Sequence, residues 1–167
     1  MTGLEGGRNP ATTTPAQPLC AGTSIAAALS NDPDRSMRIA YITETYPPEL
    51  NGVALTAART VRHLRERGHA VDLIRPRQPD DAGSAAADEW LSSGCPIPLY
   101  PELRFGLATP SALRRRYVQH GPDLVHLATP GPLAWAALGA ARAMGIPASS
   151  DFRTNFHQYS GYYHLGA

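Results

Sequence analysis

Lysine is absent from this chain of 167 residues, and all fifteen of its basic side chains are arginines. Fourteen acidic residues nearly balance them, which leaves a formal net charge of +1 at pH 7. A chain without a large excess of either sign lacks the electrostatic signature of a protein that binds bulk nucleic acid. We therefore expect no nucleic-acid partner.

Cysteine and long apolar runs are also scarce. Cys20 and Cys95 lie far apart and match no metal-ligand spacing, so the sequence predicts neither a disulfide framework nor a metal site. Such usage is typical of a reducing compartment, and we expect a cytoplasmic protein. No apolar run reaches the length of a membrane span. The short patch Ile25–Leu29 makes a poor signal peptide, because the charged start and the long apolar core are missing.

Residues 1–36 contain few large apolar side chains and are rich in Ala, Thr, Pro, Gly and Ser. Such a segment buries too little surface to offset the entropy of ordering, so we expect a disordered leader. Met37 directly precedes the first periodic segment. One interpretation is that translation starts there and the leader is an artefact, and the other is a genuine flexible tail. Residues 37–167 are enough for one domain of ordinary size.

Apolar periodicity predicts alternating strands and helices from residue 38 onward. Strands are expected at 38–42, 70–74, 97–100, 124–127 and 146–149, and helices at 53–67, 110–118 and from the 128–132 junction to 144. Thr109 is the expected cap of the second helix, and Gly68 and Gly145 are expected to end the first and third. The alternation favours an α/β fold, a Rossmann-like doubly wound parallel sheet of about five strands with helices on both faces.

Four segments are expected to lie at the surface or at the edge of the sheet. Residues 80–94 are small and polar, which indicates a surface loop or a loose helical turn. Prolines at 96, 98 and 101 confine the expected 97–100 strand to the edge of the sheet. Arg114–Arg116 are expected to form a solvated helix face, and residues 151–163 a polar and aromatic loop that enters a helix.

The segment from Glu44 to Thr56 carries the first candidate site. Pro47 and Pro48 favour extended conformations in the residues before them, so the chain must arch before the helix begins. Gly52 then allows close approach of a ligand, and the helix start offers N–H groups to a phosphate. A tight structural turn without a ligand explains the same pattern, and spacing alone weighs the two interpretations evenly.

Three polar segments should meet at the carboxyl edge of the sheet, where ligands bind in such folds. They are the 47–52 loop, the 126–131 junction and the 151–163 segment. A nicotinamide site, with Arg75 facing a ribose phosphate, is rejected because the G-x-G-x-x-G fingerprint is absent. For His126, spacing alone favours a buried imidazole bonded to the backbone. No nucleophile–base pair is evident, so the catalytic residues remain unknown.

Six segments occur in an order that resembles the amino-terminal half of a family-four glycosyltransferase. They are MRIAY (37–41), ETYPPELNGVA (44–54), LRERGHAV (64–71), PDLVHLATPGPL (122–133), GIP (145–147) and TNFHQY (154–159). The nearest branch is that of the GDP-mannose-dependent α-mannosyltransferases and sulfoquinovosyl transferases. The resemblance covers residues 37–167. It implies a GT-B architecture, in which an acceptor-side domain and a donor-binding domain face each other across a cleft.

The resemblance also implies roles for individual residues. Asn51, Gly52 and Val53 would bind the donor phosphate. The acceptor and sugar pocket would be formed by His126, Thr129, Gly131, Arg153 and Thr154. Many relatives have a histidine two positions after His126 that touches the transferred sugar, but Ala128 stands there, as in the mannosyltransferase branch. Arg153 replaces the histidine typical of the branch, which indicates either a clamp for an anionic acceptor or a degraded site.

The activity implied is retaining, metal-independent transfer of a hexose, with GDP-mannose as the expected nucleotide-sugar donor and a lipid or glycan as acceptor. No cofactor or metal is expected. By comparison with the family, we expect the donor-binding domain to be absent and the acceptor domain to be incomplete, and we expect this fragment alone to be inactive. A lipid acceptor would bring peripheral contact with the inner face of a membrane. The alternatives are a non-catalytic Rossmann-like binding module, a gene remnant, or one subunit of a split enzyme whose partner chain supplies the donor domain.

Overall fold

A computed structural model describes residues 35–79, 81, 85–97 and 100–151. The expected leader up to residue 34, and the candidate residues Arg153 and Thr154, lie outside the described residues. The described part contains a six-stranded sheet in the order β4-β3-β2-β1-β5-β6. Its strands are β1 (Arg38–Ile42), β2 (Ala70–Pro76), β3 (Glu89–Ile97), β4 (Tyr100–Leu107), β5 (Leu124–Leu127) and β6 (Ala148–Ser150). Every pair of neighbouring strands is parallel except β3 and β4.

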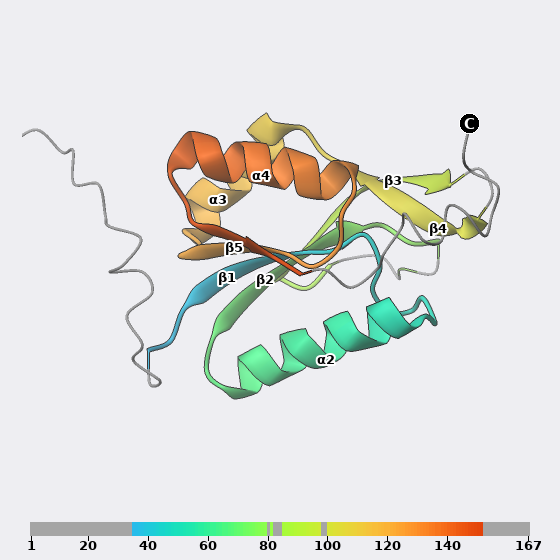
Figure 1. The fold of residues 1–167 in the computed structure, drawn as a ribbon, viewed down its shortest axis with the longest axis horizontal. Coiled ribbons are helices and arrows are strands. Elements are labelled where there is room, and N and C mark those ends of the chain that lie inside the picture. Colours follow the sequence, from blue (N-terminus) through green and yellow to red (C-terminus); the bar gives the residue numbers. More distant parts are fainter. Residues whose placement is uncertain (1–34, 80, 82–84, 98–99, 152–167) are drawn as a thin grey trace, which may run out of the picture.

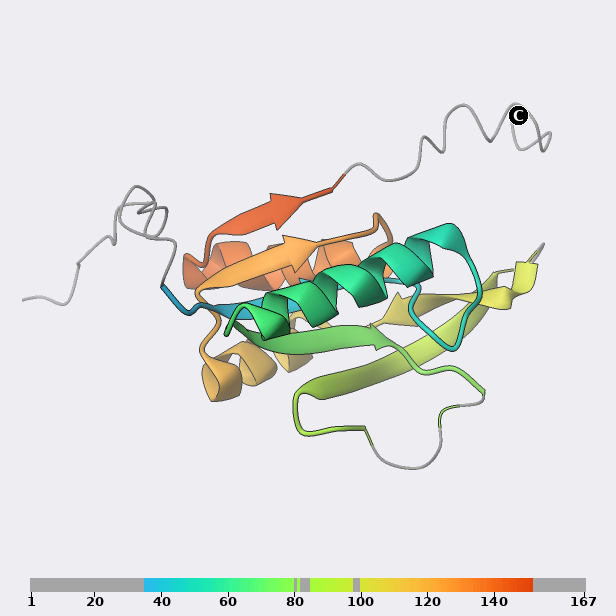
Figure 2. The ribbon, with the colours of Figure 1, turned by 90° about the horizontal axis from the view of Figure 1, so that it is seen from below.

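Helices cover both faces of this sheet (Figure 1). Helix α2 (Gly52–Glu66) packs on one face, and α3 (Pro110–His120) and α4 (Pro132–Met144) lie together on the other. The order of strands and helices confirms the expected α/β doubly wound fold. Figure 2 shows that β1, β2 and β5 run in the same direction, so their carboxyl ends share one edge of the sheet.

The core is divided by the sheet into two clusters, as strict alternation along β1 requires. Ala40 and Ile42 face α3 and α4, where they meet Leu113, and the alanines of α4 let that helix approach closely. Tyr41 points the other way and packs beneath Ala57 of α2. All of these side chains are fully buried, so β1 is the central strand on which both helix layers are built.

The helices begin and end close to the predicted residues, because capping residues next to each helix end determine where it begins or stops. Asn51 caps α2 and Thr109 caps α3, each through a side-chain oxygen that accepts a backbone N–H. Gly68 and Gly145 follow α2 and α4 with φ of 83° and 67°, a left-handed conformation that glycine adopts at little cost.

The expected strand at 97–100 is wrong, and so is the loop expected across 89–94. Residues 89–97 form β3, which reverses into β4, and the predicted strand falls at the reversal. Only the first part of β3 pairs with β2, ending at the pair of Pro76 with Ser92. Beyond that point β3 pairs with β4 alone. Pro96 lies in this outer stretch, where a residue that cannot donate a backbone hydrogen bond to a second neighbouring strand is tolerated. The sheet therefore has six strands rather than five.

Arg116 corrects the expectation of a solvated arginine face on α3. Arg114 and Arg115 are exposed as expected, but Arg116 turns toward the sheet. Its Nε and Nη2 donate to the two carboxylate oxygens of Asp72 on β2, at 3.0 and 2.5 Å. Among the described residues, no helix combines the length and the apolar character that crossing a bilayer would need.

Candidate functional site

The chain just before the expected 47–52 loop meets the 126–131 junction at the carboxyl edge of the sheet. Ile42 and Leu127 are partners at the ends of β1 and β5, and the chain beyond each strand turns toward the other. The backbone N–H of Glu44 donates to Thr129 Oγ1 at 2.7 Å, and Ala128 N donates to the Ile42 carbonyl at 2.8 Å. The third segment, 151–163, lies outside the described residues beyond Asp151.

Glu44 is the buried centre of this edge, with 9% of its surface exposed. Its carboxylate accepts hydrogen bonds from the backbone N–H of Leu133, at 2.9 Å, and from Gly106 N on β4. Burial raises the pKa of Glu44, and the bonds from these two N–H groups and from Ala134 oppose that rise. The carboxylate thus occupies the positive amino end of α4, where Gly131 provides no side-chain cap.

Gly131 is required by this arrangement rather than by its backbone angles. A Cβ at this position would lie 2.1 Å from Glu44 Oε1, well inside contact distance. The predicted pocket residues Thr129 and Gly131 therefore come together, and both contact Glu44. Sequence reasoning missed Glu44 itself, although a carboxylate directly after a buried strand and an uncapped helix start at Gly131 were the available signals.

The amino end of α2 is arranged differently. Asn51 Oδ1 accepts from Ala54 N at 2.8 Å, and its Nδ2 donates to Thr45 Oγ1 at 2.8 Å, so the Asn51 side chain is held within the loop. Within the described ranges, the backbone N–H groups of Gly52 and Val53 have no hydrogen-bond partner. A Cβ at Gly52 would meet no atom within 4 Å, so this helix start faces open space.

Glu49 fixes the loop that leads into α2. Thr45 Oγ1, Asn51 Nδ2 and Gln78 Nε2 all donate to its carboxylate. Burial raises the pKa of Glu49, and the hydrogen bonds from Thr45 and Asn51 act against that rise. Because Gln78 follows β2, the Glu49 carboxylate ties the loop to the neighbouring strand.

Arg75 has a structural role at the end of β2. It is 6% exposed, and its guanidinium donates to Asp81 at 2.6 and 2.9 Å and to Glu89 at 2.7 Å. Burial acts to lower the pKa of Arg75, but the bonds to the two carboxylates outweigh burial and raise it. A guanidinium engaged in this way is not available to a ribose phosphate, which agrees with rejection of the nicotinamide interpretation.

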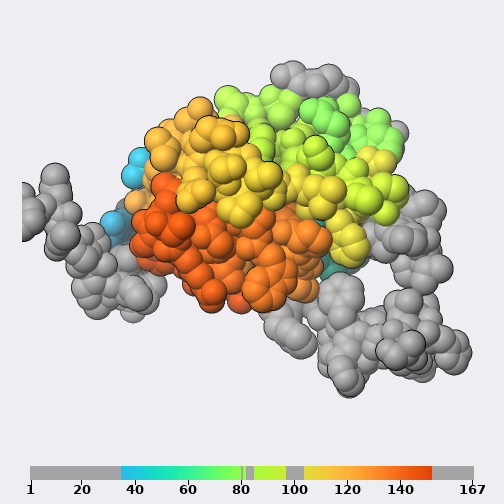
Figure 3. Space-filling view, turned by 90° about the horizontal axis from the view of Figure 1, so that it is seen from above, coloured from blue at the N-terminus to red at the C-terminus, as the bar shows by residue number. Residues whose placement is uncertain are grey.

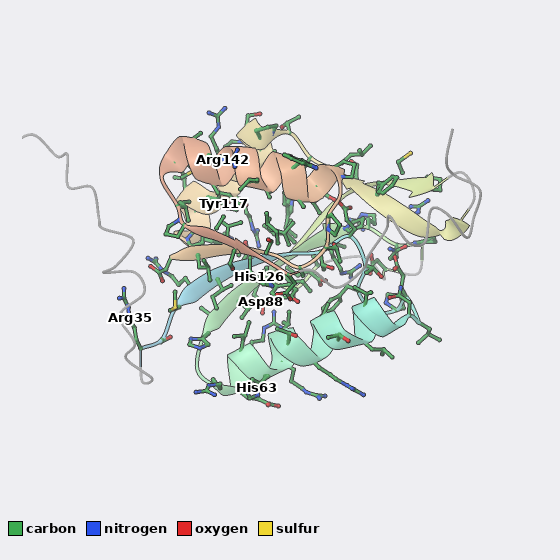
Figure 4. All side chains as sticks on the ribbon, viewed as in Figure 1. Arg35, His63, Asp88, Tyr117, His126 and Arg142 are labelled. Atoms are coloured by element: carbon green, nitrogen blue, oxygen red, sulfur yellow. The ribbon has the colours of Figure 1, made fainter. Side chains whose placement is uncertain are left out.

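His126 lies on the face of β5 that is shared with α2 (Figure 4). Its side chain is 17% exposed, and its ring lies 5.0 Å from that of Tyr41. Nδ1 is 3.0 Å from Ser149 Oγ, and Nε2 is 3.4 Å from Asp151 Oδ2. The mostly buried ring agrees with the expected burial, but these contacts are with the side chains of Ser149 and Asp151 rather than with the backbone expected from spacing.

A pocket of about 310 Å³ opens at the opposite, amino edge of the sheet. Charged side chains that line it take part in ion pairs, Arg65 with Asp88 at 2.6 Å and Asp72 with Arg116. The carboxyl ends of α2 and α3 also lie there, which disfavours anions. The carboxyl edge is thus the better candidate for chemistry.

Residues 50–167 match the family described as Glycosyltransferase Family 4. The chain belongs to glycosyltransferase family 4. Its Rossmann-like sheet is the fold expected for the amino-terminal half of a GT-B enzyme, and the resemblance seen in the sequence motifs is confirmed.

Several curated members of family 4 are similar to this chain. GDP-mannose-dependent alpha-mannosyltransferases of Corynebacterium glutamicum and Mycolicibacterium smegmatis are each 34% identical over 137 residues. These matches cover 78% of this chain and 32% and 36% of the two relatives. A sulfoquinovosyl transferase of Arabidopsis thaliana is 24% identical over 123 residues, covering 73% of this chain and 24% of that protein. The chain thus spans about a third of the length of its mannosyltransferase relatives.

Proposed function

We propose that this family-4 chain forms the acceptor-side wall of a retaining, metal-independent transferase. The enzyme moves a mannosyl group from GDP-mannose to a lipid or glycan acceptor at the cytoplasmic side of a membrane. Two relatives named as GDP-mannose-dependent alpha-mannosyltransferases support the choice of sugar and nucleotide. The donor-binding half belongs to the remaining length of such an enzyme or to a separate chain.

The proposed donor contact rests on one observation, the open amino end of α2. Gly52 N–H and Val53 N–H are uncommitted within the described residues, whereas Glu44 already fills the amino end of α4. An anion that approaches this edge is therefore attracted to α2 and repelled from α4. Hydrogen bonds from these N–H groups would stabilise the diphosphate as it leaves the sugar.

The acceptor would occupy the neighbouring part of the edge, over β5. Thr129 and Gly131 shape the turn after this strand, and His126 lies between Ser149 and Asp151 on the α2 side. Hydroxyl and imidazole groups of this kind can hydrogen-bond the hydroxyls of a sugar. Thr154 and Arg153 are proposed to complete the pocket.

Titration calorimetry with GDP tests the donor contact on the chain as it exists. Gly52→Pro removes one N–H but suits the first helical position, and Asn51 already has the extended φ of −136° and ψ of 161° that proline requires before it. Losing a hydrogen bond to a charged phosphate should weaken GDP binding about tenfold or more. Gly52→Ala keeps the N–H and serves as the matched control, since its Cβ meets open space.

The results of the GDP titrations distinguish the proposed donor contact from the alternative of a non-catalytic binding module. Equal affinity for GDP in the original chain and Gly52→Pro contradicts a phosphate contact at α2. No GDP binding by the original chain, together with binding of a mannose-containing glycan, favours a non-catalytic binding module instead.

A further inference from the structure

Helices α3 and α4 form one layer whose charges all have the same sign. Neither helix contains an aspartate or a glutamate. Together they contain four arginines, Arg114, Arg115, Arg116 and Arg142. Figure 3 shows the two helices side by side, as a continuous gold and orange surface on the outside of the molecule. A chain with a net charge of only +1 thus concentrates positive charge on one face.

The exposed part of this layer, which we call the α3–α4 face, combines cations with large apolar side chains. Arg114, Arg115 and Val118 lie at helical spacing on the outside of α3, with Val118 74% exposed. On α4, Trp135 is 72% exposed, and Arg142 follows it two turns later on the same side. Within the described residues, no ion pair or hydrogen bond engages the guanidinium groups of Arg114, Arg115 or Arg142.

The arginines of α2, on the opposite face of the sheet, provide a contrast within the same molecule. Arg62 pairs with Glu66 at 3.8 Å, and Arg65 pairs with Asp88 at 2.6 Å. On α3, the inward-turned Arg116 is also paired, with Asp72. Within the described residues, Arg59 is the α2 arginine without an ion pair, whereas on the outside of α3 and α4 all three arginines lack one and no acidic residue accompanies them.

We propose that the α3–α4 face is a docking surface for a bilayer that contains anionic phospholipid. Positive charge is attracted to the negative surface of such a bilayer, and each arginine near that surface adds to the attraction. A guanidinium group can donate two parallel hydrogen bonds to the oxygens of one phosphate group. Tryptophan side chains favour the boundary between lipid headgroups and acyl chains. The lack of acidic residues on both helices removes the repulsion that would oppose this contact.

Neither α3 nor α4 is by itself a basic amphipathic helix of the usual interfacial kind, because the apolar sides of both helices are packed in the core. The docking surface arises only when the fold places the two outer faces next to each other. It does not depend on glycosyl transfer, and its test is separate from GDP binding.

Co-sedimentation of the full chain with vesicles is the direct test. Phosphatidylcholine vesicles and vesicles of phosphatidylcholine mixed with phosphatidylglycerol are compared at low and high salt. We expect binding to the mixed vesicles that weakens with salt. The double variant Arg114→Gln and Arg115→Gln should bind the mixed vesicles about tenfold or more weakly, as two surface cations are lost. Arg59→Gln with Arg62→Gln on exposed positions of α2 is the matched control and should bind as the original chain does.

Tryptophan fluorescence locates the contact. The chain has two tryptophans, and Trp90 is half-buried against the core. In Trp90→Phe the remaining emission comes from Trp135, and we expect it to shift to shorter wavelength on the mixed vesicles and to be quenched by brominated lipid. Circular dichroism of each variant establishes that it is folded.

Three results would overturn the proposal. They are equal binding to neutral and mixed vesicles, equal losses in the α3 and α2 double variants, and vesicle binding without any change in Trp135 emission. Binding to a soluble polyanion such as heparin, combined with no binding to either vesicle, would show instead that the face serves an acidic macromolecule.

Discussion

At the scale of single residues, Glu44 is a buried anion whose partners are backbone N–H groups rather than a basic side chain. Glu44→Ala would leave the buried N–H groups of Gly106 and Leu133 without an acceptor. We expect a loss of about 2–5 kcal/mol in the free energy of unfolding. Urea denaturation measures it, with the exposed Glu66→Ala as control, expected within about 0.5 kcal/mol of the original chain.

Gly131→Ala extends the same experiment into a double-mutant cycle. The new Cβ would collide with the Glu44 carboxylate, so the single variant should be destabilised. In a Glu44→Ala background the collision disappears, and the second substitution should cost much less. Strictly additive losses would show that Gly131 is needed for a reason other than contact with Glu44.

How far the sequence predicts single residues depends on the distance to their partners. The cap Thr109 was predicted because it bonds an N–H three residues away, and Asn51 caps α2 through the same kind of local bond, although the family resemblance had assigned it to the donor phosphate. Glu44 was not, because Gly106 and Leu133 lie 62 and 89 residues further along the chain. The inward turn of Arg116 was missed for the same reason, since Asp72 is 44 residues away on another element.

At the scale of elements, α3 has one side bound to the sheet and another facing solvent. Arg116→Ala would leave the Asp72 carboxylate, which is 7% exposed, without its bidentate partner. A loss of about 2–4 kcal/mol is expected, because removing one member of a buried pair leaves the other charge uncompensated. Arg114→Ala and Arg115→Ala should change stability by less than about 0.5 kcal/mol. Thermal or urea unfolding of the three variants makes the comparison, and equal losses in all three would contradict it.

The elements that the sequence predicted well are those whose own residues specify them. Apolar periodicity and end signals determine α2, α3 and α4, and a run of apolar residues determines β1. Strand β3 is different, since its residues are small, polar or proline over much of its length. It is a strand because β2 and β4 supply partners on either side, and such tertiary context cannot be read from local propensity.

At the scale of the whole molecule, topology was predictable from alternating elements and short connections, which allow few arrangements. The convergence of the loops after β1 and β5 follows from that topology. The candidate site was only partly predictable: the sequence indicated Gly52, Thr129 and Gly131, but not that Glu44 fills one helix end and leaves the other open. The unpaired arginines of the α3–α4 face were also hidden, because they come together only when the two helices pack side by side.

The pH dependence of stability is a further property of the whole molecule. Burial raises the pKa of Glu49 above 4.5, so the folded state binds this proton more tightly than the unfolded state does. The resulting stability is present below pH 4.5 and is lost as the pH rises through the raised pKa. Glu49→Gln removes this titration. Relative to that variant, the original chain should lose stability between acidic and neutral pH, as denaturation midpoints can show, and a pH-independent difference would contradict the assignment.

The position of the sheet behind the α3–α4 face determines how far the candidate site would lie from a bilayer bound at that face. Docked through this face, the strands run along the bilayer rather than into it, and the carboxyl edge opens sideways. One helix layer, about 10 Å thick, then separates the bilayer from the sheet edge where Thr129 lies, and Gly52 lies beyond the sheet on the side of α2. An acceptor whose reactive hydroxyl lies at the level of the lipid phosphates would fall short of that edge. A lipid whose headgroup already carries a projecting sugar would reach it, so the two proposals together lead us to expect extension of a glycolipid rather than glycosylation of a bare lipid.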